Sequence, residues 1–392
     1  FVLASIFLDA MGHGLLAPIV PDLIQELASV DVSKAAVYGG AIVALFAVIQ
    51  FFATPLLGSL SDTFGRRPVL LVSLTAFGLN YLLMAFSVSI EWLFIAQALA
   101  GLFGATPAVA GAFMADISTP EERIKRFGSL GAAYGLGFMF GPVLSSLLAE
   151  WGLRLPIFIA AILILSNAFV GYFVFKESLD KHHRKSFSWR EASPWGVFFA
   201  LRKIPQIPKI LASVLCLHIA LNTVPTIWPY FTTFKLGWTP KEIGLSLGLY
   251  GIVSIIAQVF LVARLSARFG DLRTSIIGMS GLLLGSLGFA FVSEQWLLIL
   301  FIIPSALGFM TNAALISHLS KMVGNTGQGT LQGAFLATRS LGAVITPLSM
   351  PWLFHLFTTS NNGLPTFAGV QFLVAAILTT LAIVFLTKSS KH

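Results

Sequence analysis

Long apolar runs alternate with short polar or charged segments along nearly all of the 392-residue chain. A helix that crosses the hydrocarbon core of a bilayer needs about 20 mostly apolar residues. Charged and Pro/Gly-rich breaks delimit twelve such runs, at 1–22, 37–60, 68–88, 92–114, 127–149, 155–176, 207–231, 243–264, 273–292, 296–319, 329–354 and 366–387. The pattern therefore predicts an all-α integral membrane protein with twelve transmembrane helices.

One connection is longer and more polar than the others. From Lys176 to Lys209 the chain carries eight lysines and arginines, together with His182 and His183. Such a segment is typical of the cytoplasmic side of a membrane protein. We therefore divide the chain into a first six-helix bundle at 1–176, a cytoplasmic linker at 177–206 and a second six-helix bundle at 207–392.

An internal repeat supports two related halves. At an offset of 205 residues, segment 60–65 (Leu-Ser-Asp-Thr-Phe-Gly) matches segment 265–270 (Leu-Ser-Ala-Arg-Phe-Gly). The same offset carries Gly128 onto Gly333 and Pro142 onto Pro347. Parallel six-helix repeats that enclose a substrate site near the midplane are the plan of a large class of transporters. The repeat thus predicts two pseudo-symmetric bundles.

Composition and charge narrow the function further. Hydrophobic residues make up 56% of the chain and charged residues only 10%, against about 25% charged residues in soluble domains. This excludes an ordinary soluble enzyme and a disordered chain. The net charge of +8 lies in short loops rather than on a nucleic-acid-binding face, since nineteen lysines and arginines fall in alternate loops and termini and only four in the others. The bias places both termini in the cytoplasm.

The sequence holds no pattern that predicts catalysis. It has no Walker-type phosphate loop, no metal-ligand cluster, no nucleophile–base arrangement, and a single cysteine, Cys216. We therefore expect no enzymatic activity, no cofactor and no metal site.

Residues 58–68 (Gly-Ser-Leu-Ser-Asp-Thr-Phe-Gly-Arg-Arg-Pro) connect the second and third predicted spans. Gly58 is expected to let helices approach closely and Gly65 to allow a tight turn. Asp62 is expected to face the positive end of a neighbouring helix, and Arg66 and Arg67 to bridge to carboxylates. The alternative is a loop whose arginines only fix the topology.

This loop resembles the signature loop of the major facilitator superfamily. The resemblance implies that Gly58, Asp62, Gly65, Arg66 and Arg67 form a cytoplasmic gate. Thr63 stands where the family has a basic residue, and the copy in the second half is degenerate. Gating by charge is therefore expected to be asymmetric.

The fifth predicted span carries Gly137, Gly141 and Pro142. Small residues at this spacing permit close helix packing in a membrane, and Pro142 is expected to bend the helix. The set resembles the glycine-proline motif of the family's antiporters, which usually export. Packing alone is the alternative reading.

Further matches cover essentially the whole chain and are strongest over residues 8–145. They include Leu8-Asp9-Ala10-Met11-Gly12 and Ala115-Asp116-Ile117, and they are similar to the tetracycline/proton antiporters. The resemblance implies a secondary active transporter in a bacterial inner membrane that works by alternating access, as a functional monomer. Its expected partners are a small amphipathic drug or metabolite, protons and lipid, with no nucleic acid. The alternative is an importer or facilitator of a nutrient or siderophore-type ligand without proton antiport.

The chain departs from those antiporters at coupling positions. It keeps the acid of the first helix as Asp9, but has Asn80, Gln97, Ser254 and Leu282 where the resemblance leads us to expect acidic or basic groups. His13 lies four residues after Asp9, about 5–6 Å away on the same helix face, so the two are expected to handle protons. The alternative is that His13 donates to a backbone carbonyl and Asp9 has a structural role.

Other intramembrane polar residues are candidates for binding substrate, because amides and aromatics suit an apolar ligand with a few polar groups. These candidates are Gln50, Asn80, Gln97, Asn222, Trp228, Tyr230, Gln258, Asn312 and Arg339. His218 is expected to be a satisfied structural histidine.

Arg339 lies about 15 Å into the eleventh span at 1.5 Å per residue, and its guanidinium stays charged. Three arrangements remain open for it. Carbonyls of the seventh or eighth helix accept its hydrogen bonds, Asp9 pairs with it, or an acidic group of the substrate contacts it.

Overall fold

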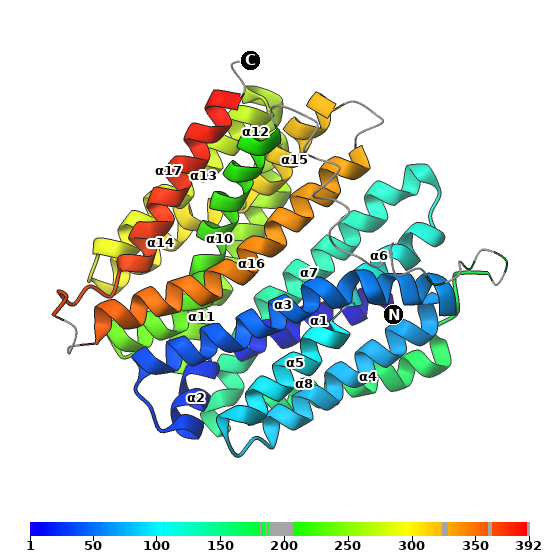
Figure 1. The fold of residues 1–392 in the computed structure, drawn as a ribbon, viewed down its shortest axis with the longest axis horizontal. Helices are drawn as coiled ribbons and strands as arrows, with labels where there is room; N and C mark the ends of the chain where they lie inside the picture. Colours follow the sequence, from blue (N-terminus) through cyan, green and yellow to red (C-terminus); the bar gives the residue numbers. More distant parts are fainter. Residues whose placement is uncertain are drawn as a thin grey trace. The chain divides into compact units, whose positions relative to one another are not determined.

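The computed structural model describes residues 1–104, 106–180, 182, 184, 187, 207–323, 328–359 and 363–389, and within these ranges it contains helices and no strands. The helices of the first half are α1 Val2–Leu16, α2 Val20–Ala28, α3 Val32–Phe64, α4 Arg66–Ala85, α5 Ile90–Phe103, α6 Thr106–Asp116, α7 Pro120–Leu148 and α8 Leu155–Val174. Those of the second half are α10 Ile207–Leu236, α11 Pro240–Ile256, α12 Val262–Phe269, α13 Asp271–Phe291, α14 Gln295–Leu307, α15 Met310–Val323, α16 Gln328–Thr358 and α17 Val370–Ser389 (Figure 1).

The described chain confirms the predicted membrane fold. Eleven helical segments are long and apolar enough to cross a bilayer, and the pair α1 and α2 makes a twelfth if it is one span. The prediction of a single helix at 1–22 is wrong in detail, because α1 and α2 meet at a break with a bend of 54°. Other spans are also composite. The segment Ile90–Asp116 combines α5 and α6, and Pro240–Phe269 combines α11 and α12 through a π-helical turn at Ala257–Leu261.

The chain forms two compact units. The first consists of Phe1–Val30, Ile42–Pro194 and Pro240–Leu245, and the second of Asp31–Ala41, Trp195–Thr239 and Ser246–His392. The boundaries predicted for the linker, 177–206, stay a prediction, because residues 188–206 lie outside the described residues.

In the first unit, α1 packs along α7, and α4 packs against both α8 and α5. A buried cluster joins α1, α4 and α6 near one end of the unit, and it includes Ile6, Leu74 and Val109. In the second unit, α10 packs between α16 and α17. Its core includes Val214, Leu217 and Phe335.

The internal repeat reappears in how the two units are built. Residues 31–41 at the start of α3 belong to the second unit, and residues 240–245 at the start of α11 belong to the first. The 205-residue offset carries 31–41 onto 236–246, so the exchanged segments correspond to each other.

The close contacts within the units also obey this repeat. A Cβ at Gly40 would lie 2.1 Å from the Pro347 carbonyl oxygen in the second unit. A Cβ at Gly244 would lie 2.3 Å from the Pro142 carbonyl oxygen in the first unit. Pro142 and Pro347 are repeat mates, whereas Gly244 lies one residue before Leu245, the repeat mate of Gly40, so a similar glycine-on-proline contact occurs twice with a shift of one residue.

Candidate functional site

Asp9 is the buried carboxylate of the first unit. It lies in the middle of α1 and is 3% exposed. Its carboxyl group faces the side chains of His13, Thr106 and Tyr81, which come from α1, α6 and α4. In the part of the chain that the structure describes, no lysine or arginine pairs with Asp9.

His13 is held by the backbone rather than by the Asp9 carboxylate. Its Nδ1 lies 2.9 Å from the Asp9 carbonyl oxygen, one helical turn earlier. The imidazole ring contacts the rings of Phe46 and Phe77 at 5.3 and 5.1 Å between centroids. With Nδ1 donating to the carbonyl, Nε2 is the proton-accepting nitrogen of the neutral ring. The carbonyl contact expected as the alternative is present, and the proton-coupling role of His13 stays a prediction.

Tyr81 is a site residue that the sequence analysis missed. It is 1% exposed and its hydroxyl would lie 2.5 Å from a Cβ at Gly12, so the missing side chain of Gly12 makes room for it. The neighbouring Asn80 is 4% exposed, and its Oδ1 has no hydrogen-bond partner among the described residues. A tyrosine next to an asparagine inside an apolar span was the available signal, because polar groups in a bilayer are costly.

Glycines of α7 fix α1, and therefore Asp9, in place. A Cβ at Gly137 would lie 2.2 Å from the Phe7 carbonyl oxygen, and one at Gly141 would lie 2.4 Å from the Met11 carbonyl oxygen. In return, a Cβ at Gly14 would lie 2.9 Å from Cδ of Pro142. The expected glycine-mediated packing is thus present, while the bend at Pro142 stays a prediction.

Two predicted amides of the first unit already have partners. Gln50 donates from Nε2 to the Gly104 carbonyl oxygen at 2.8 Å, at the junction of α5 and α6. Gln97 lies with Nε2 at 3.8 Å from Met84 Sδ. Their roles in binding substrate stay predictions.

In the second unit, three of the candidates are tied into the helices. Asn222 donates to the His218 carbonyl oxygen at 2.9 Å, and Gln258 donates to the Ser254 carbonyl oxygen at 3.3 Å. Trp228 is 1% exposed and donates from Nε1 to Ser246 Oγ at 2.9 Å.

The remaining candidates of the second unit differ from one another. Tyr230 is buried at 4% exposure. Asn312 Oδ1 has no hydrogen-bond partner in the described ranges. Arg339 is exposed and makes no hydrogen bond or ion pair with the described part of the chain. The expected contacts with carbonyls of the seventh or eighth predicted span, which correspond to α10 and to α11 with α12, are therefore not formed.

The loop between α3 and α4 is built on Gly65 and Glu177. Gly65 has φ +107°, a value that favours glycine, which confirms the expected tight turn. Glu177 accepts hydrogen bonds from the backbone N–H groups of Arg66 at 2.8 Å and Arg67 at 3.2 Å. The carboxylate therefore caps the first turn of α4, where it also interacts favourably with the helix dipole.

Arg66 joins the loop to α6. Its guanidinium contacts Asp62 at 2.5 Å, Asp116 at 3.1 Å and Ser61 Oγ at 2.6 Å. Asp116 also accepts a hydrogen bond from Ser178 Oγ at 3.0 Å. The expected bridges from the arginine pair to carboxylates are thus present for Arg66. Asp62 pairs with Arg66, the first residue of α4, and its expected place at the positive end of a neighbouring helix stays a prediction.

Arg67 and Gly58 deviate from expectation. Arg67 donates to the Tyr172 carbonyl oxygen at 2.5 Å and lies over the Tyr172 ring at 5.7 Å, so it pairs with no carboxylate in the described ranges. No described atom lies within 4 Å of a Cβ built at Gly58. The close approach expected there is absent from this conformation.

Comparisons with known proteins agree with this architecture. The family model of the Major Facilitator Superfamily matches residues 2–347 and 210–392. The class C tetracycline resistance protein of Escherichia coli is 34% identical over 368 residues, covering 94% of this chain and 92% of the relative. Multidrug resistance protein 2 of Bacillus subtilis (strain 168) is 30% identical over 389 residues, covering 96% of this chain and 93% of the relative.

The fold comparison extends to distant transporters. The crystal structure of the nucleoside transporter NupG has a TM-score of 0.80 at 16% identity, with 100% of this chain and 98% of that chain covered. Because the family model and the relatives of 30% or higher identity cover most of its length, the chain belongs to the Major Facilitator Superfamily, whose members carry small molecules across lipid bilayers and are not enzymes.

Proposed function

We propose that this protein is a proton-driven antiporter that expels amphipathic drugs or metabolites by alternating access. Its relatives named for resistance to tetracycline and to multiple drugs support drug efflux. We assign it to a bacterial cytoplasmic membrane, as its relatives are bacterial, and we propose that it works as a monomer. Both termini are placed on the cytoplasmic side, because nineteen lysines and arginines fall in the loops of that side and four in the others.

The observation that carries the proposal is the buried carboxylate of Asp9. An ionised side chain at the centre of a membrane helix costs about 2.5–3.5 kcal/mol on insertion scales. Asp9 is 3% exposed and has no cationic lysine or arginine partner among the described residues. Proton uptake removes this charge, so a conformational change that alters the solvation of Asp9 is linked to protonation.

His13 and Tyr81 complete the proposed proton site. Both side chains lie within electrostatic reach of the Asp9 carboxylate, and the Nε2 of His13 is left to exchange protons with water or with Asp9. Because Nδ1 is engaged with a carbonyl, His13 tunes the site rather than replacing Asp9 in it.

The cytoplasmic gate in this proposal is the network of Asp62, Arg66, Asp116 and Glu177. The network ties the end of α3 and the start of α4 to the end of α6 and to the segment after α8. These ends thereby move together as one body on the cytoplasmic side. Glycine at position 65 leaves room for the capping carboxylate, since a Cβ there would lie 2.2 Å from Glu177 Oε2.

The test uses inverted vesicles whose membranes contain the protein, with tetracycline and ethidium as transport probes. Wild type is expected to accumulate a probe when a proton gradient is present and to lose it when an uncoupler collapses the gradient. Asp9→Asn is expected to abolish uphill accumulation and to retain downhill exchange. Asp180→Asn, the same change at an exposed acid of the segment after α8, serves as the control.

His13→Gln is expected to shift the pH profile of transport without abolishing it, because the change removes the proton-accepting Nε2 and keeps a hydrogen-bond donor. Unchanged uphill accumulation by Asp9→Asn contradicts the assignment of the proton site. Accumulation by wild type that survives the uncoupler contradicts proton antiport itself.

A further inference from the structure

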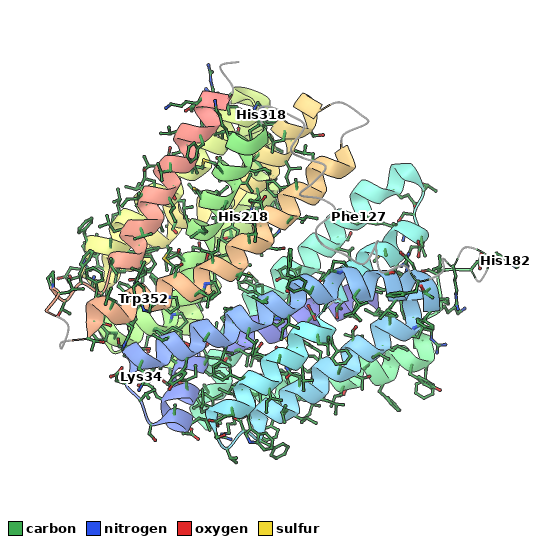
Figure 2. All side chains as sticks on the ribbon, in the orientation of Figure 1. Lys34, Phe127, His182, His218, His318 and Trp352 are labelled. Carbon is green, nitrogen blue, oxygen red and sulfur yellow. The ribbon has the colours of Figure 1, made fainter. Side chains whose placement is uncertain are left out.

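Arg339 and His218 lie together on facing sides of α16 and α10 in the second unit. The His218 ring makes an edge contact with Phe335 at 5.5 Å between centroids, and the His218 Cβ would lie 3.0 Å from a Cβ at Gly342. Phe335, Arg339 and Gly342 follow one another at spacings of four and three, so they share one face of α16. The imidazole is therefore flanked along α16 by the two neighbours of Arg339 on that face. Figure 2 labels His218 on α10.

Neither basic group has a hydrogen-bond or ion-pair partner within the described ranges. His218 is 2% exposed, and its Nε2 has no hydrogen-bond partner among the described residues. The two groups interact electrostatically with each other, and that interaction is repulsive when both carry charge. The expectation that His218 is a satisfied structural histidine is therefore wrong. A buried polar atom without a partner in a native protein calls for an explanation such as an absent ligand.

The second unit holds no acidic residue that can neutralise Arg339. Its three carboxylates are Asp31, Asp271 and Glu294. Each one lies at the beginning of a helix. Asp31 directly precedes α3, Asp271 is the first residue of α13, and Glu294 is the N-cap of α14. Arg339, by contrast, is the twelfth residue of α16, about 16 Å from its start at 1.5 Å per residue.

The exposed apolar side chains of α16 are not confined to one side of the helix, because Leu336, at 57% exposure, lies only about 60° around it from Arg339. Leu341, Leu348 and Trp352 are exposed at 38%, 53% and 54%, as expected for side chains that contact lipid. At 3.6 residues per turn, Arg339 lies about 140–180° around the helix from each of these three residues. A guanidinium inside a membrane span normally faces a partner or a water-filled cavity.

We propose that Arg339 and His218 form an anion subsite that binds the acidic group of an amphipathic substrate. The guanidinium offers a bidentate pair of N–H donors to a carboxylate, sulfonate or enolate, and Nε2 of His218 offers a third donor from the buried side. This inference rests on the proposed transport function and adds that organic anions with an apolar body are one class of its amphipathic substrates.

The experiment measures binding by isothermal titration calorimetry, using the purified full-length protein in detergent. The two probes are naphthalene-2-sulfonate, which is anionic at every pH used, and naphthalene-2-sulfonamide, which is neutral. Wild type is expected to bind the sulfonate at least tenfold more tightly than the sulfonamide. Arg339→Gln is expected to reduce this preference to less than twofold while leaving the affinity for the sulfonamide unchanged.

Three further variants make the result specific. Arg339→Lys is expected to keep part of the preference, because lysine retains the charge but not the bidentate geometry. His218→Gln is expected to lower sulfonate affinity several-fold, even if Arg339→Gln is too unstable to measure. Arg268→Gln, the same change at an exposed arginine of α12 in the same unit, is expected to change neither affinity.

Equal affinity of wild type for the two probes, or no binding of either, overturns the anion subsite. A preference that survives both Arg339→Gln and His218→Gln also overturns it. Failure of the proposed function is read separately, from uncoupler-sensitive accumulation of ethidium in vesicles, because ethidium carries no acidic group for Arg339 to bind.

Discussion

Replacing Gly141 by alanine tests how α1 is held. A Cβ at this position would lie 2.4 Å from the Met11 carbonyl oxygen, 2.7 Å from the Leu15 nitrogen and 2.9 Å from the Gly14 carbonyl carbon. All three atoms belong to the backbone of α1, so no side chain can rotate away. The two helices must separate by about 1 Å to restore an ordinary contact distance of about 3.4 Å.

Overpacking of this kind costs about 1–3 kcal/mol. Gly131, ten residues earlier on α7, provides the matched control, because nothing lies within 4 Å of a Cβ built there. Gly131→Ala is expected to stabilise the protein by about 0.4–1 kcal/mol, since alanine restricts the unfolded chain. The two substitutions of the same kind on the same helix thus have opposite expected signs.

The assay is thermal unfolding of purified protein in detergent, followed by tryptophan fluorescence, together with vesicle transport. For a compact unit of about 200 residues, 1 kcal/mol shifts the unfolding temperature by about 2–4 °C, so Gly141→Ala should unfold at least about 3 °C below Gly131→Ala. It should also transport less, because Asp9 and His13 are carried on the displaced helix. Equal unfolding temperatures for the two variants would refute the claim that backbone contact fixes α1.

Two further substitutions test the turn before α4. Glu177→Ala is expected to lower the free energy of unfolding by about 1–2 kcal/mol, since it removes the cap of the first two amides of α4. The control Glu122→Ala breaks only an exposed ion pair within one helix, so it should lower that free energy by less than about 1 kcal/mol in the same unfolding assay. Gly65→Ala combines a positive φ with a collision with the capping carboxylate, while Gly363→Ala has a positive φ of +70° and open space around it. Gly363→Ala should therefore destabilise the protein by about 1–2 kcal/mol from backbone strain alone. Gly65→Ala should destabilise it by more, because the collision adds to the strain, and an equal loss in the two variants would show that the carboxylate simply moves aside.

The spans and the loop turn were predictable because each depends on local sequence. Apolar length defines a membrane helix, and Gly65 alone signals a backbone conformation that other residues avoid. The break between α1 and α2 was not predictable from proline content. Pro55 and Pro142 lie inside continuous helices, so Pro18 gave no reason to expect a break.

The partners within the site were less accessible to sequence reasoning. Arg66 meets Asp116 and Glu177, which lie 50 and 111 residues further along the chain, and no local pattern links such distant positions. The repeat predicts how the halves correspond but says nothing of which helix faces meet inside a half. For the same reason, Tyr81 and His218 acquired their significance only when their neighbours on other helices were known.

The contact between α1 and α7 has a mechanical consequence. The two backbones are in direct contact there, without flexible side chains between them, so α1 and α7 are expected to move as one rigid body. Sliding by one turn would bring Ser145 to the place of Gly141, and a serine does not fit where a glycine is required. A change in the hydration of Asp9 must therefore come from movement of the helices that cover it, α4 with Tyr81 and α6 with Thr106, while α1 and α7 keep their mutual position.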